Sequence, residues 1–302
     1  MQIGAQFMGD PGGPKAFAVR AEAAGFDSVW CGDHVGHIVD GLAALGCFAG
    51  ATERITIGVN VIVVPYRPAA IIAKALSTIA LVAPGRVIAG FGVGGEFPGE
   101  FTATGADLHT RGPATDEALE VIERLWTGEA VTYRGRWVTL DDLQIEPAAD
   151  PAPTVWIGGR SDAALRRAVR FGAGYTPYLV SPEQLAKRRR RLGELAIEGD
   201  RRPEDLAVGC LVTMIPGASV EEAVEVGISS LRLTGLSPEG VRAWYLIGDD
   251  ESILARLQEY VDAGADHLIL GCLPGDERQV DEFFRTFGRI LPAARALRPS
   301  VR

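Results

Sequence analysis

Asp33 and His34 form a pair suited to acid–base chemistry, because they leave a short apolar run together. Imidazole titrates near neutral pH, so His34 can take up or release a proton, and we expect both residues to be catalytic. Two alternatives remain open: His34 could be structural, or the pair could bind a metal ion with His37. We expect no metal site, because further ligands are needed and the only other histidines are His109 and His267.

A glycine-rich segment offers a second set of candidates after another apolar run. Gly92 and Gly94 allow a flat ligand to approach the backbone closely, so we expect them to contact a cofactor. Glu96 is a candidate catalytic acid, and Glu100 is a further acidic residue in the same segment. Glycine runs and exposed glutamates are both common in loops, so the segment alone does not decide its function.

A third set, Gly158-Gly159-Arg160-Ser161, stands between an apolar run and a helical pattern. Glycine amides and the positive end of the helix dipole favour a bound anion, and Arg160 adds a positive charge. Ser161 could equally serve only as the N-cap of the helix. We expect this turn to bind the phosphate of a cofactor.

The order of the elements indicates how these candidates are brought together. Eight strand-like runs alternate with amphipathic helical stretches from end to end, which favours an α/β fold of the (β/α)₈ TIM-barrel type. An open doubly wound sheet is the alternative, but the first turn reads FMGDPGG and contains no G-x-G-x-x-G. In such a barrel the active site lies at the carboxyl ends of the strands. The predicted strands are 2–7, 26–31, 55–64, 86–92, 154–158, 174–178, 206–215 and 266–271.

Three segments interrupt this alternation, and we interpret them as insertions in a single domain that spans 1–302. Residues 93–112 are glycine-rich and predicted to be an irregular loop. Residues 129–152 contain a hairpin pattern around Arg134-Gly135. The third insertion, 232–248, mixes loop and helical patterns.

Composition excludes several classes of function. A net charge of −9 argues against binding to nucleic acid or to an anionic membrane surface. No apolar run is long enough to span a bilayer, and the first residues do not resemble a secretory signal, so we expect a cytoplasmic protein. The four cysteines lie in or beside apolar segments and are expected to be reduced thiols of the core.

In combination, these segments resemble the luciferase-like family of flavin-dependent monooxygenases and F420-dependent oxidoreductases. The resemblance covers nearly the whole chain. It rests on GFDSVW at 25–30 leading to DH at 33–34, ITIGVNVIVVPYRPAAIIAKALSTIALVAPGRVIAGFGVGGE at 55–96, EFTATG at 100–105, Arg111 ahead of TDEALEVIERLWTGEAVTYRGRW, PTVWIGGRS at 153–161 and AGADHLILG at 263–271.

This resemblance implies a cofactor at the carboxyl end of the barrel, with its phosphate held by Gly158, Gly159 and the adjoining helix start. It also implies a non-proline cis peptide at Asn60-Val61, in a bulge that backs the flavin-type ring, so Asn60 and Val61 are expected to contact the cofactor.

For the candidate catalytic residues, the resemblance implies that Asp33 and His34 lie beside a deazaflavin, with His34 taking the proton of a substrate hydroxyl. It implies an acid near the ring at Glu96 and a structural or loop-anchoring role for Arg111.

We expect an F420-dependent oxidoreductase that acts on a small molecule, and an FMN-dependent monooxygenase is the alternative. A flavin storage protein and a phosphosugar barrel enzyme without a redox cofactor are further hypotheses. Ile38 stands where sugar-oxidising relatives carry a tryptophan, which weakens a sugar-phosphate substrate. Trp244 and Tyr245 are candidates for the substrate pocket. The resemblance also suggests a homodimer.

Overall fold

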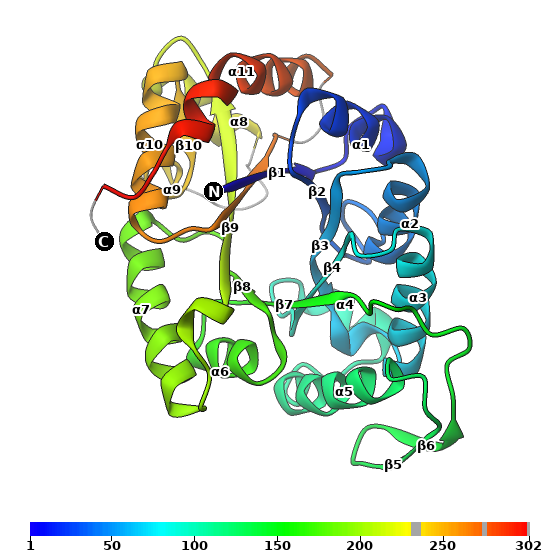
Figure 1. The fold of residues 1–302 in the computed structure, drawn as a ribbon. Helices are drawn as coiled ribbons and strands as arrows, with labels where there is room; N and C mark the ends of the chain where they lie inside the picture. Colours follow the sequence, from blue (N-terminus) through cyan, green and yellow to red (C-terminus); the bar gives the residue numbers. More distant parts are fainter. Residues whose placement is uncertain (231–236, 274–276, 301–302) are drawn as a thin grey trace.

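A closed parallel barrel forms the centre of the molecule (Figure 1). The computed structural model describes residues 1–230, 237–273 and 277–300. The sheet runs in the order β10-β9-β11-β1-β2-β3-β4-β7-β8, and β9 also pairs with β8, which closes the barrel. Within the described chain β10 pairs only with the end of β9, so the other eight strands make the barrel. These are β1 (Gln2–Phe7), β2 (Ser28–Cys31), β3 (Thr56–Val63), β4 (Val87–Gly92), β7 (Thr154–Gly158), β8 (Gly174–Thr176), β9 (Ala207–Pro216) and β11 (His267–Gly271).

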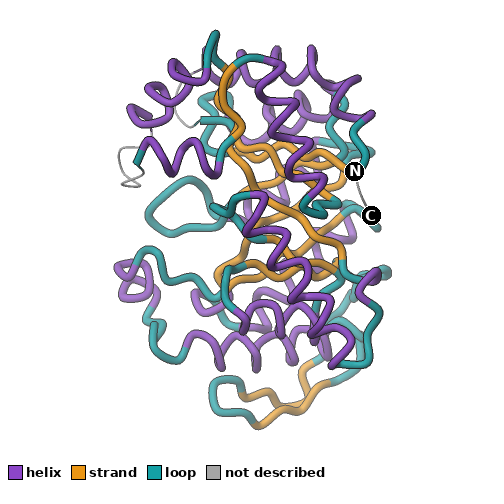
Figure 2. The backbone as a smooth tube through the Cα atoms, turned by 90° about the vertical axis from the view of Figure 1, so that its left-hand side faces the viewer, coloured by secondary structure: helices purple, strands orange, loops and turns teal. Residues whose placement is uncertain are grey.

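Helices surround this barrel and connect its strands (Figure 2). Their sequences carry ordinary start signals: Ser161 and Ser181 cap the helices that follow β7 and β8, and Ser181 forms a capping box with Gln184. The helices that follow barrel strands are α1 (Gly13–Ala24), α2 (Gly41–Ala51), α3 (Ala69–Val82), α5 (Arg111–Leu125), α6 (Asp162–Phe171), α7 (Pro182–Glu198), α10 (Asp250–Asp262) and α11 (Glu277–Ala296). Short 3₁₀ turns occur at Val64–Tyr66 and Pro203–Asp205.

Aromatic side chains fill the lower half of the barrel interior. The rings of Trp30 and Trp156 lie 5.4 Å apart, and His267 packs edge-on against both at 5.5 Å. Indoles of this size fit because glycines face them: a Cβ on Gly58 would lie 2.2 Å from the Trp30 ring, and one on Gly209 would lie 2.4 Å from that of Trp156. These aromatic rings therefore pack closely against one another and against the glycines of neighbouring strands inside the barrel.

The segments that we interpret as insertions contain regular structure, which in one of them differs from the prediction. The hairpin predicted within 129–152 is formed by β5 (Val131–Arg134) and β6 (Thr139–Leu143). The segment 93–112, predicted to be irregular, contains the helix α4 (Pro98–Thr104). Pro98 in its first turn and Gly105 at its C-cap, with φ of 71°, are the signals that the glycine-rich context obscured.

The third insertion also contains regular structure. α8 (Val220–Ser230), α9 (Pro238–Trp244) and β10 (Leu246–Gly248) follow β9, while 231–236 lie outside the described residues. Among the described residues no helix has the length and apolarity that a membrane span requires. The four cysteines are free, and Cys31, Cys210 and Cys272 are buried as expected.

Candidate active site

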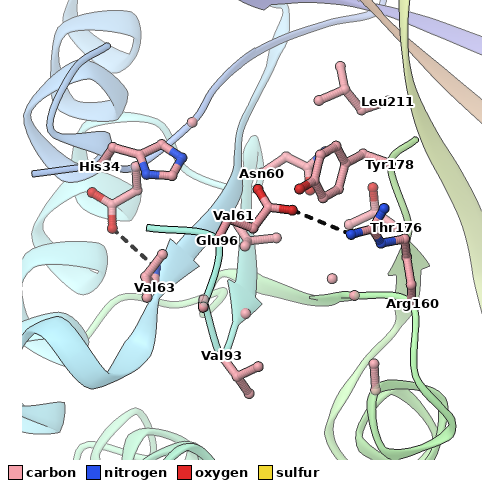
Figure 3. Close-up of a pocket in the computed structure, with 18 of the residues that line it drawn as sticks. His34, Asn60, Val61, Val63, Val93, Glu96, Arg160, Thr176, Tyr178 and Leu211 are labelled. Atoms are coloured by element: carbon pink, nitrogen blue, oxygen red, sulfur yellow. Dashed lines mark hydrogen bonds and ion pairs between the residues drawn. The ribbon is translucent and has the colours of Figure 1, made fainter. Parts of the chain in front are cut away.

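A cavity of about 580 Å³ opens at the carboxyl ends of the barrel strands (Figure 3). All the residues predicted from the sequence to be catalytic or to bind the cofactor line it. Those residues are Asp33, His34, Asn60, Val61, Gly92, Gly94, Glu96, Gly158, Gly159, Arg160 and Ser161. They come from the ends of β2, β3, β4 and β7, so the barrel brings together segments that are more than 120 residues apart in sequence. Their roles in binding and catalysis are proposals.

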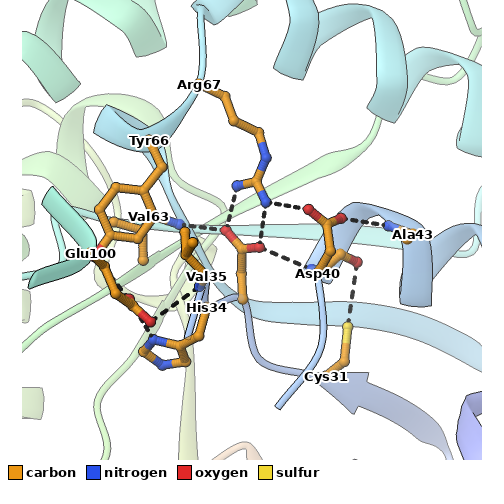
Figure 4. A network of polar contacts seen from close by, with 11 residues as sticks. Cys31, His34, Val35, Asp40, Ala43, Val63, Tyr66, Arg67 and Glu100 are labelled. Atoms are coloured by element: carbon orange, nitrogen blue, oxygen red, sulfur yellow. Dashed lines mark hydrogen bonds and ion pairs between the residues drawn. The ribbon is translucent and has the colours of Figure 1, made fainter. Parts of the chain in front are cut away.

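His34 is held by a carboxylate that comes from α4 (Figure 4). Its Nδ1 lies 3.0 Å from Oε2 of Glu100, whose other oxygen accepts hydrogen bonds from the amides of Val35 (3.1 Å) and Gly36 (2.8 Å). Since a carboxylate only accepts, the proton of a neutral His34 ring must reside on Nδ1. Nε2 is then unprotonated and free to take up a proton from a ligand.

Glu100 is ionised in this setting although it is buried. Burial alone would raise its pKa, but the hydrogen bonds from the Gly36 amide and the His34 ring outweigh burial and lower the pKa of this carboxyl. Tyr66 donates a further hydrogen bond to Oε2 at 3.1 Å. The pKa of the Tyr66 hydroxyl is raised, first by burial and then by Glu100, so the phenol stays protonated and remains a donor.

Asp33 does not present a free carboxylate to the cavity. Arg67 binds both of its oxygens, at 2.7 and 2.8 Å, and the amides of Gly41 (2.9 Å) and Val63 (3.1 Å) complete its bonding. Arg67 also binds Asp40 at 2.5 Å. With its acceptor sites filled, Asp33 joins the loop after β2 to the end of β3. We therefore assign it a positioning role in place of the acid–base role expected from the sequence.

The wall formed by β3 contains the predicted bulge. The Asn60-Val61 peptide is cis, as the resemblance implied, and the pairing with β4 shifts register between Val59 and Ile62. Val61 consequently lies over the neighbouring strands: a Cβ on Gly92 or Gly158 would come within 2.4 or 2.5 Å of its side chain. These two glycines are needed to make room for Val61, a reason that the sequence did not reveal.

The turn from β7 into α6 has the form of an anion cradle. Gly159 has a φ of 128°, which only glycine adopts easily, and it turns the chain into the helix. The hydroxyl of Ser161 accepts a hydrogen bond from the amide of Ala164 at 3.3 Å, so the N-cap function is real. On the same wall, Arg167 is bound to Asp116 at 2.5 Å. Of these arginines, Arg160 has the more exposed side chain.

Arg160 is engaged across the cavity by Glu96, at 3.5 Å (Figure 3). Both side chains are nearly half exposed, so this ion pair is weak and easily exchanged. The guanidinium also lies 5.1 Å from the centre of the Tyr178 ring. An anion bound at the cradle would therefore compete with Glu96 for Arg160.

Three buried polar atoms on the cavity wall lack a hydrogen-bond partner among the described residues. They are Oε1 of Gln6, Oγ1 of Thr176 and the hydroxyl oxygen of Tyr178. Gln6 and Thr176 are 1% and 2% exposed. Buried polar groups are normally satisfied, so these atoms mark places where a ligand's polar groups would bind.

Sequence reasoning did not identify every residue of this site. Glu100 was noted only as an acidic residue of its segment, and Tyr66, Gln6, Thr176 and Tyr178 were not singled out. Inward alternation at the strand ends would have suggested Gln6 and Thr176.

One expectation from the sequence, a substrate pocket at Trp244 and Tyr245, does not hold at the cavity. Trp244 and Tyr245 do not line it; they pack in a separate cluster with Ile215, Val241 and neighbouring apolar residues. Arg111 donates to the carbonyl of Leu108 at 2.6 Å, in keeping with a loop-anchoring role. Among the described residues no His, Cys, Asp and Glu side chains gather in a group of three that could hold a metal ion.

Comparison with known proteins identifies the family that this chain matches. The family model described as luciferase-like monooxygenase matches residues 8–234. A curated relative, the F420-dependent glucose-6-phosphate dehydrogenase of Nakamurella multipartita, is 30% identical over 321 residues, covering 93% of this chain and 91% of the relative.

Solved structures share the fold at lower identity. An F420-dependent secondary alcohol dehydrogenase in complex with an F420–acetone adduct superposes with a TM-score of 0.88 at 23% identity, covering 97% of this chain and 98% of that one. The monooxygenase RslO1 from Streptomyces bottropensis gives 0.84 at 20% identity, with coverages of 97% and 99%. At these identities the two structures support the fold alone.

Proposed function

The chain belongs to the luciferase-like monooxygenase family, and on this premise we propose that it is an oxidoreductase that transfers a hydride between F420 and a small organic substrate. The observation that carries this proposal is the His34–Glu100 pair at the cavity wall. Interconverting a hydroxyl and a carbonyl requires a proton acceptor beside the hydride path, and this pair supplies one. The curated relative is an F420-dependent dehydrogenase, which supports the same choice of cofactor.

The residues of the cavity fit a cofactor with a flat ring and a phosphate. The cradle at Gly158–Ser161 would hold the phosphate through backbone amides and Arg160, while the wall at Asn60 and Val61 would back the ring. The Thr176 hydroxyl, which has no hydrogen-bond partner in the described part of the chain and lies next to Gly158 in the sheet pairing, offers a further hydrogen bond on that side. When bound, F420 supplies a deazaflavin carbon that exchanges a hydride with the substrate.

His34 would act as the general acid/base. In the direction of substrate oxidation, its Nε2 takes the hydroxyl proton as the hydride leaves, and the positive charge that develops on the ring is stabilised by Glu100. Tyr66 and the amides of Val35 and Gly36 hold Glu100 in place, so the imidazole is already oriented before the substrate binds. Glu96 would assist as an acid near the ring once Arg160 is bound to the phosphate.

A titration of the purified protein with F420 and, separately, with FMN tests this proposal. We expect F420 to bind saturably and more tightly than FMN. The His34→Asn variant should still bind F420 but should lose hydride transfer between F420 and the substrate. Tight binding of FMN with weak or no binding of F420 would contradict the proposal and favour the FMN-dependent monooxygenase. Full turnover by the His34 variant would refute the assigned role of the histidine.

A further inference from the structure

The charges that line the cavity are already matched in pairs. Asp33 is bound to Arg67, Glu96 to Arg160, and Arg167 to Asp116. Within the described lining there is no lysine, and both arginines, Arg160 and Arg167, lie on the wall formed by β7 and α6. The described part of the cavity therefore has a single cationic region, and the proposed cofactor phosphate occupies it.

The opposite side of the cavity, next to His34, is largely apolar and has no lysine or arginine among the described lining residues. The ring of Phe97 lies 5.1 Å from that of His34 in an edge-on arrangement. Ile38 and Phe97 are 40% and 37% exposed, although both are large apolar side chains, and Met8 lies on the same cavity wall. Apolar surface left open beside polar groups is typical of a pocket that binds an apolar ligand.

Gln6 provides a neutral polar group on this side. It stands on β1 opposite Trp30 of β2, and its Nε2 lies 3.8 Å from the position that a Cβ on Gly32 would occupy. Gly32 precedes His34 by two residues, so the Gln6 amide belongs to the His34 side of the cavity. Its Oε1 is buried and unpartnered among the described residues. An amide both donates and accepts, so it suits a hydroxyl or a carbonyl oxygen.

A phosphate ester on the His34 side would find no cation among the described lining residues. Burying an unpaired anion costs far more free energy than one hydrogen bond returns. An alcohol or ketone incurs no such cost, and its apolar body would cover Phe97 and Ile38.

Resting on the function proposed above, we infer that the substrate is an uncharged alcohol, or its carbonyl counterpart, with an apolar body, and that Gln6 is a specificity-determining residue. In the oxidation step the carbinol C–H bond breaks and its electron pair leaves as hydride to F420. The hydroxyl proton passes to Nε2 of His34, and the C=O bond forms while the Gln6 amide bonds the oxygen. The alcohol is oxidised and F420 is reduced.

The test uses protein first loaded with F420, with loading verified by fluorescence, and compares cyclohexanol, glucose and glucose 6-phosphate as substrates without oxygen. We expect kcat/KM for cyclohexanol to exceed that for glucose 6-phosphate by at least about 100-fold. Failure to load F420 refutes the proposed function. Oxidation of glucose 6-phosphate at a comparable rate, or no reaction with neutral alcohols or their ketones, overturns only the substrate inference.

Two further measurements separate the cofactor side from the substrate side. Inorganic phosphate should weaken F420 binding and leave the KM for cyclohexanol in loaded protein unchanged; competition with the alcohol would overturn the inference.

Gln6→Leu should raise the KM for cyclohexanol by about 3- to 10-fold, the value of one neutral hydrogen bond, with the F420 Kd unchanged. Gln2→Leu, on the exposed end of the same strand, is the matched control. An unchanged KM in folded Gln6→Leu would remove Gln6 from the inference.

Discussion

Replacing Glu100 with glutamine should reverse the protonation pattern of the His34 ring. The amides of Val35 and Gly36 require an acceptor, so the glutamine oxygen would stay on them and its NH₂ group would face Nδ1 of His34. Nδ1 would then have to accept, and the proton would move to Nε2. An Nε2 that already carries a proton has no lone pair with which to accept one from the substrate, and a neutral glutamine no longer compensates a positive charge on the ring.

The size of this effect follows from the contact itself. The Glu100 side chain is 7% exposed and that of His34 is 26% exposed, so the charge-assisted hydrogen bond between them is only partly screened. A hydrogen bond to a charged group contributes about 1.5 to 3 kcal/mol, which corresponds to about a 10- to 150-fold change in an equilibrium constant. We expect kcat to fall by about 100-fold and the F420 Kd to stay unchanged.

Nitrogen NMR of the histidine rings measures this protonation pattern directly and needs no substrate. The wild-type spectrum at mildly alkaline pH should show His34 protonated at Nδ1, and the Glu100→Gln spectrum should show it protonated at Nε2. Glu96→Gln makes the same chemical change elsewhere in the cavity and should leave the His34 signals as in wild type. If Glu100→Gln has the wild-type pattern and a kcat within about 3-fold of wild type, the proposed role of Glu100 is refuted.

Three other substitutions probe the surrounding structure. Glu96→Gln frees Arg160 from its ion pair and should tighten F420 binding by up to about 5-fold, measured by fluorescence titration; weaker binding would contradict the exchange of partners. Asp33→Asn leaves Arg67 without its buried partner and should lower the free energy of unfolding by about 3 kcal/mol in urea titrations. Burial lowers the pKa of His267 to about 4, so an unfolded chain binds a proton there, with a pKa near 6.5, that the folded protein does not. The free energy of unfolding therefore decreases as the pH falls below about 6.5, by about 2 kcal/mol between pH 7.5 and 5. The His267→Asn substitution should remove this part of the pH dependence.

These stability measurements have matched controls on the surface. His109 is exposed, so His109→Asn should leave the pH dependence of unfolding as in wild type. Asp141 pairs with Arg134 through an exposed contact, and Asp141→Asn should change the free energy of unfolding by less than about 0.5 kcal/mol. Equal effects of the buried and exposed substitutions would show that burial does not govern these interactions.

The barrel and the location of its site could be predicted because both depend on local patterns. Buried parallel strands are written as short β-branched runs, such as ITIGVNVIVV at 55–64, and the candidate residues stand directly after them. The helix α4 was missed because its glycine-rich flanks resemble a loop, although Pro98 and Gly105 mark its ends. Local patterns thus found the barrel strands but not this short inserted helix.

Long-range pairing could not be predicted in the same way. Glu100 and His34 are 66 residues apart, and nothing in either segment shows that they meet. Asp33 is next to His34 along the chain, but its carboxylate points to Arg67 and accepts hydrogen bonds from that side chain. The sequence suggests that Gly92 and Gly158 contact a ligand. In the structure, however, both must be glycine because a Cβ at either position would collide with the Val61 side chain. In each case the deciding contact comes from another segment of the chain.

A crystal structure of the protein with F420 is the most direct test of the central claim, which is that this cavity is a deazaflavin site. We expect the ring against Asn60 and Val61, the phosphate on the amides at 158–161, and Arg160 turned from Glu96 toward the phosphate. Electron density for F420 outside the cavity, or inside it with the phosphate away from this turn, would contradict the account.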